Sequence, residues 1–177
     1  MSDWDDQARN QLLLVLADKL LESSDEILAA NAQDLARMDV SNPLYDRLLL
    51  NEARLKGIAS DIRNVATLPT PLGKVLSDTH LDNGLHIRRV SVPFGVIGII
   101  YEARPNVTSD AAALCLMAGS AVVLRGGKEA INSNMATAKI MREAIKKAGL
   151  PEDCIQLVED TSRESSLALM KMNGYVD

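Results

Sequence analysis

Aromatic side chains are scarce in this sequence of 177 residues, in which Phe, Trp and Tyr together make up 3%. Because 47% of the residues are hydrophobic, the chain has enough apolar material for a packed core, but aliphatic side chains and methionine must fill it. Long apolar runs are also missing. The run Val96–Tyr101 is far shorter than the ~20 residues that a membrane-spanning helix needs. We therefore predict a globular protein without a membrane segment.

Targeting signals, excess positive charge and cysteine motifs are absent as well. The first residues, Met1–Asp6, are acidic, which is the opposite of a signal peptide. The formal net charge of −5 disfavours nucleic acid as a partner, because phosphate binding needs a basic surface. Cys115 and Cys154 have neither CxxC nor metal-ligand spacing. These absences indicate a reduced, cytoplasmic protein with no nucleic-acid or membrane partner.

The cysteine and histidine residues give no sign of a catalytic or metal site. Cys115 lies in an apolar helical stretch and Cys154 follows a Pro-Glu-Asp turn, so we expect structural thiols rather than nucleophiles. His80 and His86 lie on the two arms of a predicted hairpin, with no carboxylate or thiol to complete a metal site. We therefore expect no metal ion and interpret both histidines as exposed or cross-strand residues.

Residues 1–70 are predicted to form a helical segment. Ser23 followed by Glu26 has capping-box spacing, which predicts that a second helix begins near Ser24. Asn51 is predicted to cap a third helix. Apolar residues recur at helical spacing in all three. The predicted faces are Leu12, Leu13, Leu16, Leu20 and Leu21; then Ile27, Leu28, Ala32 and Leu35; then Leu55, Ile58, Ala59, Ile62, Val65 and Ala66.

Residues 71–93 are predicted to form a β-hairpin. The runs Lys74–Leu81 and Leu85–Val92 flank the tripeptide Asp82-Asn83-Gly84, and Asn-Gly between two strand-like runs is a strong hairpin signal. The runs are amphipathic at best. We therefore expect the hairpin either to lie across a surface or to pair with another subunit.

Strand-like and helix-like segments alternate over residues 94–177, which predicts an α/β fold with a parallel sheet. Tyr175–Asp177 resembles the start of another strand, and strands usually need ~5–6 residues. We therefore expect an incomplete domain that continues in a longer protein; a ragged tail after the last helix is the alternative. The predicted strands are Val96–Tyr101, Ala121–Leu124 and Ile155–Val158, and the predicted helices are Val107–Ala118, Asn132–Ala148 and Ser162–Met172.

The segment after the second predicted strand is a candidate nucleotide site, because ligands bind at the carboxyl ends of strands in open α/β sheets. Gly126-Gly127-Lys128 is followed by Glu129 rather than by Ser or Thr, so the segment is not a Walker loop. The glycines let the backbone approach a ligand, and the cations Arg125 and Lys128 can pair with phosphate. Glu129 can accept hydrogen bonds from ribose hydroxyls or pair with Lys128. An ordinary strand-to-helix turn is the alternative.

The loop Glu102-Ala103-Arg104-Pro105-Asn106 is the second candidate site. Arg104 carries a planar fork that suits a carboxylate or phosphate. Asn106 can donate its side-chain amide to an oxyanion. The alternative is that Asn106 or Thr108 only caps the following helix.

Two longer runs carry a family resemblance. The sequence Val-Pro-Phe-Gly-Val-Ile-Gly-Ile-Ile-Tyr-Glu-Ala-Arg-Pro-Asn-Val-Thr covers Val92–Thr108, and Val-Leu-Arg-Gly-Gly-Lys-Glu-Ala lies within Ala121–Asn134. Both closely resemble the bacterial gamma-glutamyl phosphate reductases, which belong to the aldehyde dehydrogenase superfamily. The resemblance extends over nearly the whole chain. It implies a Rossmann-type parallel sheet that is preceded by N-terminal helices and by an oligomerisation hairpin.

The resemblance also implies an activity. Members of the family are oxidoreductases that reduce L-glutamyl 5-phosphate with NADPH to L-glutamate 5-semialdehyde and release phosphate, the second step of proline biosynthesis. This step implies a functional link to glutamate 5-kinase. By analogy, NADPH lies across the strand ends at Tyr101 and at Arg125-Gly126-Gly127-Lys128-Glu129, where two cations suit its 2′-phosphate. Arg104 and Asn106 face the substrate, and Asn106 is a supporting residue in catalysis.

The chain departs from the family in length. Members are considerably longer, and their nucleophilic cysteine lies in a later domain whose motif matches neither Cys115 nor Cys154. Residues 94–177 are therefore interpreted as the first part of an NADPH-binding α/β domain without the catalytic domain, and we expect this polypeptide alone to be inactive. The alternative is a non-catalytic module that binds a nucleotide or a partner protein, favoured by the missing nucleophile and by the helical face of the first 70 residues.

Overall fold

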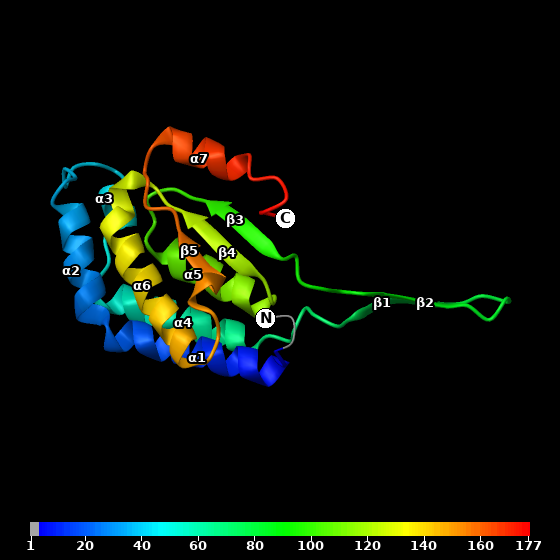
Figure 1. The fold of residues 1–177 in the computed structure, drawn as a ribbon. Helices are drawn as coiled ribbons and strands as arrows, with labels where there is room; N and C mark the ends of the chain where they lie inside the picture. Colours follow the sequence, from blue (N-terminus) through cyan, green and yellow to red (C-terminus); the bar gives the residue numbers. More distant parts are fainter. Residues whose placement is uncertain (1–3) are drawn as a thin grey trace.

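A sheet of three parallel strands lies at the centre of the computed structural model, which describes residues 4–177 (Figure 1). The strands run in the order β3-β4-β5, with β3 at Val96–Ile100, β4 at Ala121–Arg125 and β5 at Ile155–Leu157. Each strand lies within one residue of its predicted bounds. The predicted α/β fold with a parallel sheet is therefore confirmed.

Two layers of helices cover one face of the sheet, and α7 approaches β3 from the other face (Figure 1). Helices α5 and α6 connect the strands, while α1, α2 and α4 pack outside them. The helices are α1 (Asp6–Glu22), α2 (Ser24–Leu35), α3 (Tyr45–Leu48), α4 (Glu52–Thr67), α5 (Asn106–Met117), α6 (Ile131–Lys147) and α7 (Arg163–Met170), with short 3-10 turns η1 (Lys128–Ala130) and η2 (Glu152–Cys154).

The predicted apolar faces of the first and third helices pack into the aliphatic core, with only Leu21 and Val65 left partly exposed. The face predicted for the second helix is wrong in part. The residues that α2 buries are Ile27, Asn31 and Asp34, whereas Ala32 is exposed. The first N–H groups of α6 lie opposite this stripe and need acceptors, which a purely apolar face would not supply.

The predicted helix caps have different outcomes. Asn51 caps α4 as predicted, because its Oδ1 accepts a hydrogen bond of 2.8 Å from the backbone N–H of Arg54. Ser23 precedes α2 but its side chain makes no capping hydrogen bond. Its backbone, at φ −103° and ψ 21°, is not in the extended conformation that lets a cap side chain reach back to the helix.

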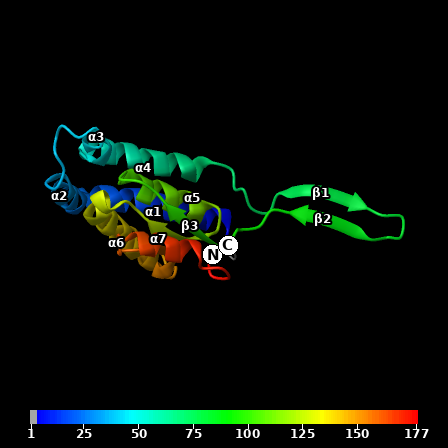
Figure 2. The same ribbon diagram turned by 90° about the horizontal axis from the view of Figure 1, so that it is seen from above.

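The predicted hairpin is confirmed and extends away from the rest of the chain (Figures 1 and 2). Strands β1 (Val75–His80) and β2 (His86–Val90) pair antiparallel, and every residue in both strands is exposed. At the turn, Gly84 has φ +85° and donates a hydrogen bond of 2.9 Å to the carbonyl of Leu81. This left-handed conformation suits glycine in a three-residue hairpin loop.

The last residues lie beside the outer edge of β3. Tyr175–Asp177 does not form the predicted strand; the structure has a single bridge between Asn173 and Val176 there. Asp177 still exchanges two hydrogen bonds with Val96, from its N–H to the carbonyl at 2.9 Å and from the Val96 N–H to its Oδ2 at 3.0 Å. The edge of β3 is thus partly paired.

No helix within residues 4–177 is both long and apolar enough to cross a bilayer. Residues 1–3, the first part of the acidic segment Met1–Asp6, lie outside the described part of the chain.

Candidate functional site

The predicted site residues gather where the three parallel strands end. Tyr101 follows β3 directly and Arg125 is the last residue of β4. The N–H of Tyr101 donates to the carbonyl of Arg125 at 3.0 Å, so the two strand ends are joined. Because the carboxyl ends of parallel strands share one edge of a sheet, the loops that follow them can build a common ligand site.

Tyr101 is bound into the fold by its hydroxyl group. The Tyr101 hydroxyl and Thr108 Oγ1 lie 2.7 Å apart, and Thr108 donates a hydrogen bond of 2.9 Å to Asn134 Oδ1. Burial raises the pKa of Tyr101 to about 12, against an ordinary value near 10. The phenol is therefore neutral at physiological pH and links the end of β3 to α5 and α6.

Arg125 is also occupied by the protein itself. Its side chain is buried, and its terminal nitrogens donate to the carbonyls of Gly126, Thr161 and Ser162, each at 2.7 Å. The guanidinium thereby connects the end of β4 to the segment after β5. Its predicted contact with a cofactor phosphate stays a prediction, and the geometry gives it a role in holding this loop.

Gly126 and Gly127 pack closely against other parts of the protein and do not border open space. A Cβ atom on Gly126 would overlap the side-chain amide of Asn134 and lie 3.0 Å from the ring of Tyr101. A Cβ atom on Gly127 would lie 3.0 Å from the backbone nitrogen of Ala103. Close packing of two neighbouring loops is thus one reason for these glycines, and the close approach of a ligand to their backbone stays a prediction.

Lys128 and Glu129 face a different environment. They border a hollow of about 330 Å³ together with Asp34, Arg37 and Thr161. Within residues 4–177, neither Lys128 nor Glu129 takes part in an ion pair, so the alternative that Glu129 pairs with Lys128 is wrong for the described chain. The hollow is therefore lined by the two cationic side chains of Lys128 and Arg37 and by the two carboxylates of Glu129 and Asp34, next to the strand ends.

Asp34 also lines this hollow. It was not predicted as a site residue from the sequence. Its fully buried carboxylate accepts hydrogen bonds from the backbone N–H groups of Asn132 and Ser133 and from both side chains. It also pairs with Arg37 at 2.8 Å. A sequence signal existed: Ile27, Asn31 and Asp34 share one helical stripe, and polar residues on a buried stripe need partners.

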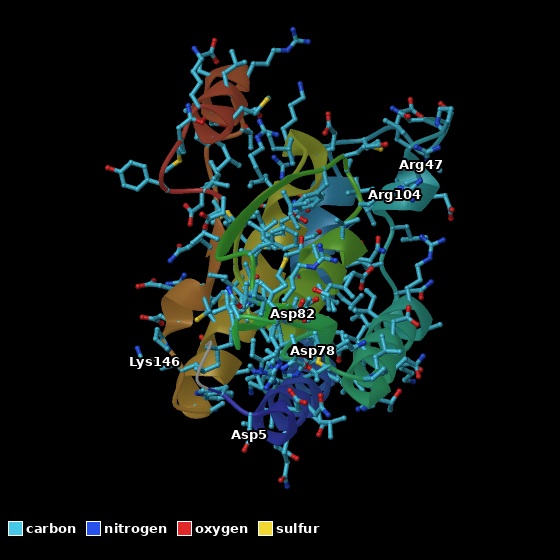
Figure 3. All side chains as sticks on the ribbon, turned by 90° about the vertical axis from the view of Figure 1, so that its right-hand side faces the viewer. Asp5, Arg47, Asp78, Asp82, Arg104 and Lys146 are labelled. Carbon is cyan, nitrogen blue, oxygen red and sulfur yellow. The ribbon has the colours of Figure 1, made fainter. Side chains whose placement is uncertain are left out.

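Arg104 and Asn106 lie in a second hollow, of about 420 Å³, between the loop after β3 and helices α3 and α4. Arg104 and Arg47 lie on the same side of the molecule there (Figure 3). Asn106 donates one amide hydrogen to Asp110 at 2.9 Å, which leaves the other for a ligand. The capping alternative is wrong, because the cap position is Pro105 and neither Asn106 nor Thr108 caps α5.

The loop between Tyr101 and Arg104 connects the two hollows. Glu102 pairs at 3.3 Å with Arg47, which borders the second hollow, while the backbone of Glu102 and Ala103 packs against Gly127, the residue before Lys128 in the first. The structure therefore brings the predicted cofactor and substrate residues to adjacent places, but not into one cavity.

Neither cysteine has the surroundings of a nucleophile. Cys115 and Cys154 are both buried, and burial raises the pKa of each thiol. A nucleophilic cysteine needs the opposite shift. The histidine prediction is wrong in one respect, because Asp78 supplies the carboxylate that His80 and His86 lacked in the sequence.

A known family matches almost the whole chain: the sequence model described as "Aldehyde dehydrogenase family" covers residues 1–175. The chain belongs to the aldehyde dehydrogenase family. The resemblance found in the sequence is confirmed at this level, and the expected combination of helices with a parallel sheet is present in three strands.

Individual relatives within the aldehyde dehydrogenase family carry a more specific name. The chain is 52% identical over 172 residues to a gamma-glutamyl phosphate reductase of Chlorobium chlorochromatii, and this covers 97% of the chain but 41% of the relative. It is 50% identical to the gamma-glutamyl phosphate reductase of Vibrio cholerae, with 96% and 41% covered. The chain thus spans less than half the length of these curated relatives.

Solved structures give the same picture. A gamma-glutamyl phosphate reductase from Thermotoga maritima superposes with a TM-score of 0.94 at 37% identity, over 99% of this chain and 43% of that one. The Saccharomyces cerevisiae gamma-glutamyl phosphate reductase gives 0.88 at 31% identity, over 99% and 46%. An acetylating aldehyde dehydrogenase from Geobacillus thermoglucosidasius, at 17% identity and a TM-score of 0.73, shares the fold.

Proposed function

We propose that this chain is the cofactor-binding part of a cytoplasmic gamma-glutamyl phosphate reductase. The reaction is the NADPH-dependent reduction of L-glutamyl 5-phosphate to L-glutamate 5-semialdehyde with release of phosphate, in proline biosynthesis. The observation that carries the proposal is the 52% identity, over 97% of the chain, to a protein of that name. The two hollows at the strand ends supply places for a nucleotide and for an anionic substrate.

The first hollow suits the phosphate-bearing end of a dinucleotide. Lys128 is exposed at its rim and can pair with a 2′-phosphate, while Arg37, also exposed there, is already held by Asp34. Glu129 is positioned to accept hydrogen bonds from a ribose hydroxyl. A volume of about 330 Å³ is at the lower end of the range for ligand pockets, so it would hold part of NADPH rather than all of it. When bound, NADPH supplies the hydride.

Arg125 and Tyr101 serve this hollow without entering it. Arg125 fixes Thr161, which itself borders the hollow, and Tyr101 fixes the loop that crosses Gly127. We assign both as positioning residues. Their hydrogen bonds to the protein keep the loop carrying Lys128 in one conformation, which lowers the entropy lost on binding.

The second hollow suits the substrate. Arg104 presents an exposed guanidinium, whose planar fork matches a carboxylate or phosphate of glutamyl phosphate. The free amide hydrogen of Asn106 can donate to an oxygen of the reacting acyl group. We propose that these two residues orient the substrate and that Asn106 supports catalysis.

The nucleophile that the family uses is, in this proposal, neither Cys115 nor Cys154. Both thiols are buried with raised pKa values, and neither borders the two hollows. The 177-residue chain alone is therefore expected to show no phosphate-dependent reduction of NADP⁺ with glutamate 5-semialdehyde.

The test compares this chain with a version extended to the length of the curated relatives. The extended version should reduce NADP⁺ in the presence of phosphate and semialdehyde, and the chain alone should not. Activity of the chain alone that is abolished by Cys115→Ser or by Cys154→Ser would refute the argument that neither cysteine is the nucleophile. An inactive extended version would refute the proposed function.

The exposed hairpin favours a homo-oligomer. Its strands expose Val75, Leu76 and Ile87 to solvent, each to about half, and an apolar surface of this kind gains by pairing with another copy. We propose that residues 71–93 form an oligomerisation arm. This observation also favours the second candidate function, a non-catalytic module that binds a partner. Light scattering with and without NADPH distinguishes the two candidate functions. A partner-binding module would form an oligomer whose mass does not respond to NADPH, because it would not bind the cofactor.

A further inference from the structure

Asp78, His80 and His86 gather on one face of the hairpin, near its tip. His80 and His86 are direct partners across the two strands, and Asp78 precedes His80 by two residues, which places all three on the same face. Asp78 Oδ1 lies 2.5 Å from His86 Nε2 and 3.7 Å from His80 Nε2. These are the only two histidines in the sequence.

The register of the hairpin explains why the two rings meet. Leu81 donates a hydrogen bond of 2.9 Å to the carbonyl of Leu85, so Leu81 and Leu85 form a hydrogen-bonded pair. Pairs alternate along an antiparallel ladder, and His80 with His86 therefore forms a non-hydrogen-bonded pair, in which side chains lie closer together. Their rings stack with centroids 3.9 Å apart and planes inclined by 14°.

We propose that Asp78, His80 and His86 form a binding site for Zn²⁺. Two imidazole nitrogens and one carboxylate oxygen are a common ligand set for this ion. The three ligand atoms lie within 4.8 Å of one another. Tetrahedral zinc with bonds near 2.1 Å separates its ligand atoms by about 3.4 Å, so rotations of exposed side chains are enough to reach it. The fourth position faces solvent and takes water.

Arg88 is expected to weaken the binding of a metal ion at this site. It is the partner of Asp78 across the strands, and its Nε lies 3.8 Å from Asp78 Oδ2. Its positive charge repels a cation and competes for the carboxylate. Arg88→Gln should therefore strengthen zinc binding. This sign is informative, because a substitution that only loosened the hairpin would weaken binding instead.

The experiment is a calorimetric titration of the chain, purified without a histidine tag, with Zn²⁺ and separately with Mg²⁺. Nitrogen-15 spectra of the imidazoles follow the same titration. We expect one zinc per chain, shifts of both imidazoles, and no binding of Mg²⁺, which prefers oxygen ligands. His86→Ala and Asp78→Asn should each weaken zinc binding at least about tenfold, the lower bound found even for residues that only orient ligands.

The matched control is Asp82→Asn. Asp82 is an exposed carboxylate on the same hairpin, outside the cluster, and Figure 3 shows both aspartates. Its substitution should leave zinc affinity unchanged. The proposal is overturned if the chain does not bind zinc, if His86→Ala binds it as tightly as the unchanged chain, or if Asp82→Asn weakens it as much as Asp78→Asn.

Discussion

The loop after β4 has two halves that use polar residues in opposite ways. In the first half, Arg125 is buried and donates to three backbone carbonyls, and Gly126 packs against Tyr101. In the second half, Lys128 and Glu129 border a hollow, and within residues 4–177 neither has an ion-pair partner. In the first half the protein's own carbonyls occupy the terminal nitrogens of Arg125, whereas in the second half the charged groups of Lys128 and Glu129 stay available to a ligand.

We therefore expect the first half of the loop to contribute to the stability of the fold and the second half to ligand binding. A polar side chain that already donates to buried carbonyls cannot leave them without a cost of the order of the hydrogen bonds it loses. Substitutions within the first half, or at Asp34 beneath the start of α6, should therefore change the free energy of unfolding. Substitutions in the second half should change ligand affinity and leave stability almost unaltered.

The largest effect is expected for Asp34→Ala, at the base of the loop. The change leaves the N–H groups of Asn132 and Ser133 without their acceptor in a buried place. We expect a loss of about 3 kcal/mol in the free energy of unfolding, measured by urea denaturation. The control is Gln33→Ala, on the exposed side of the same helix, which should cost less than about 0.5 kcal/mol. Equal losses in both variants would contradict the role of Asp34.

The next effect is expected for Gly126→Ala. The added methyl group would crowd Tyr101 and Asn134, and overpacking costs about 1–3 kcal/mol. Gly57→Ala is the matched control, because a Cβ atom there meets nothing within 4 Å in the exposed part of α4. It should stabilise the protein by up to about 1 kcal/mol. Stabilisation by Gly126→Ala would show that the loops are not closely packed.

The smallest effect on stability is expected for Tyr101→Phe. Loss of the hydroxyl removes one hydrogen bond with Thr108 and should cost about 1 kcal/mol at neutral pH. The pKa of Tyr101 is raised to about 12 in the folded protein from an ordinary value near 10. Its stabilising contribution is therefore complete below pH 10 and is lost as the pH rises toward 12.

The pH dependence gives this variant its own control. The unchanged protein should lose stability between these two pH values, and Tyr101→Phe should lose less. Tyr175→Phe, which alters a tyrosine that is 75% exposed, should behave like the unchanged protein. If Tyr101→Phe and the unchanged protein follow the same alkaline curve, Tyr101 does not titrate as described.

Most of the fold could be predicted from the sequence, because hydrophobic periodicity and turn residues act locally. Asn51 capped its helix, Gly84 formed the hairpin turn, and the three strands lay within a residue of their predicted bounds. The predicted cap at Ser23 was wrong, because capping-box spacing does not reveal the backbone conformation that joins two consecutive helices.

The candidate site was less predictable, because its polar residues are positioned by partners distant in the sequence. Arg125 was expected to bind phosphate, and only the fold shows that Thr161 and Ser162 take its hydrogen bonds. Asp34 lies 98 residues before Asn132, whose backbone N–H donates a hydrogen bond to its carboxylate. Asp78 lies close to the histidines in the sequence, but its contact with His86 depends on the register of the hairpin.

The proposed cofactor site is tested most directly by the dissociation constants of NADPH and NADH for the unchanged chain and for the variants Lys128→Ala and Lys146→Ala. Lys146, labelled in Figure 3, is an exposed lysine at the far end of α6. We predict that the chain binds NADPH more tightly than NADH, and that Lys128→Ala weakens NADPH about tenfold, as loss of one charge-assisted contact of ~1.4 kcal/mol would. Lys128→Ala should change neither the NADH affinity nor the free energy of unfolding. Lys146→Ala should leave the NADPH affinity unchanged. Equal affinity for both nucleotides, or an unchanged NADPH affinity in Lys128→Ala, would contradict the assignment of this hollow.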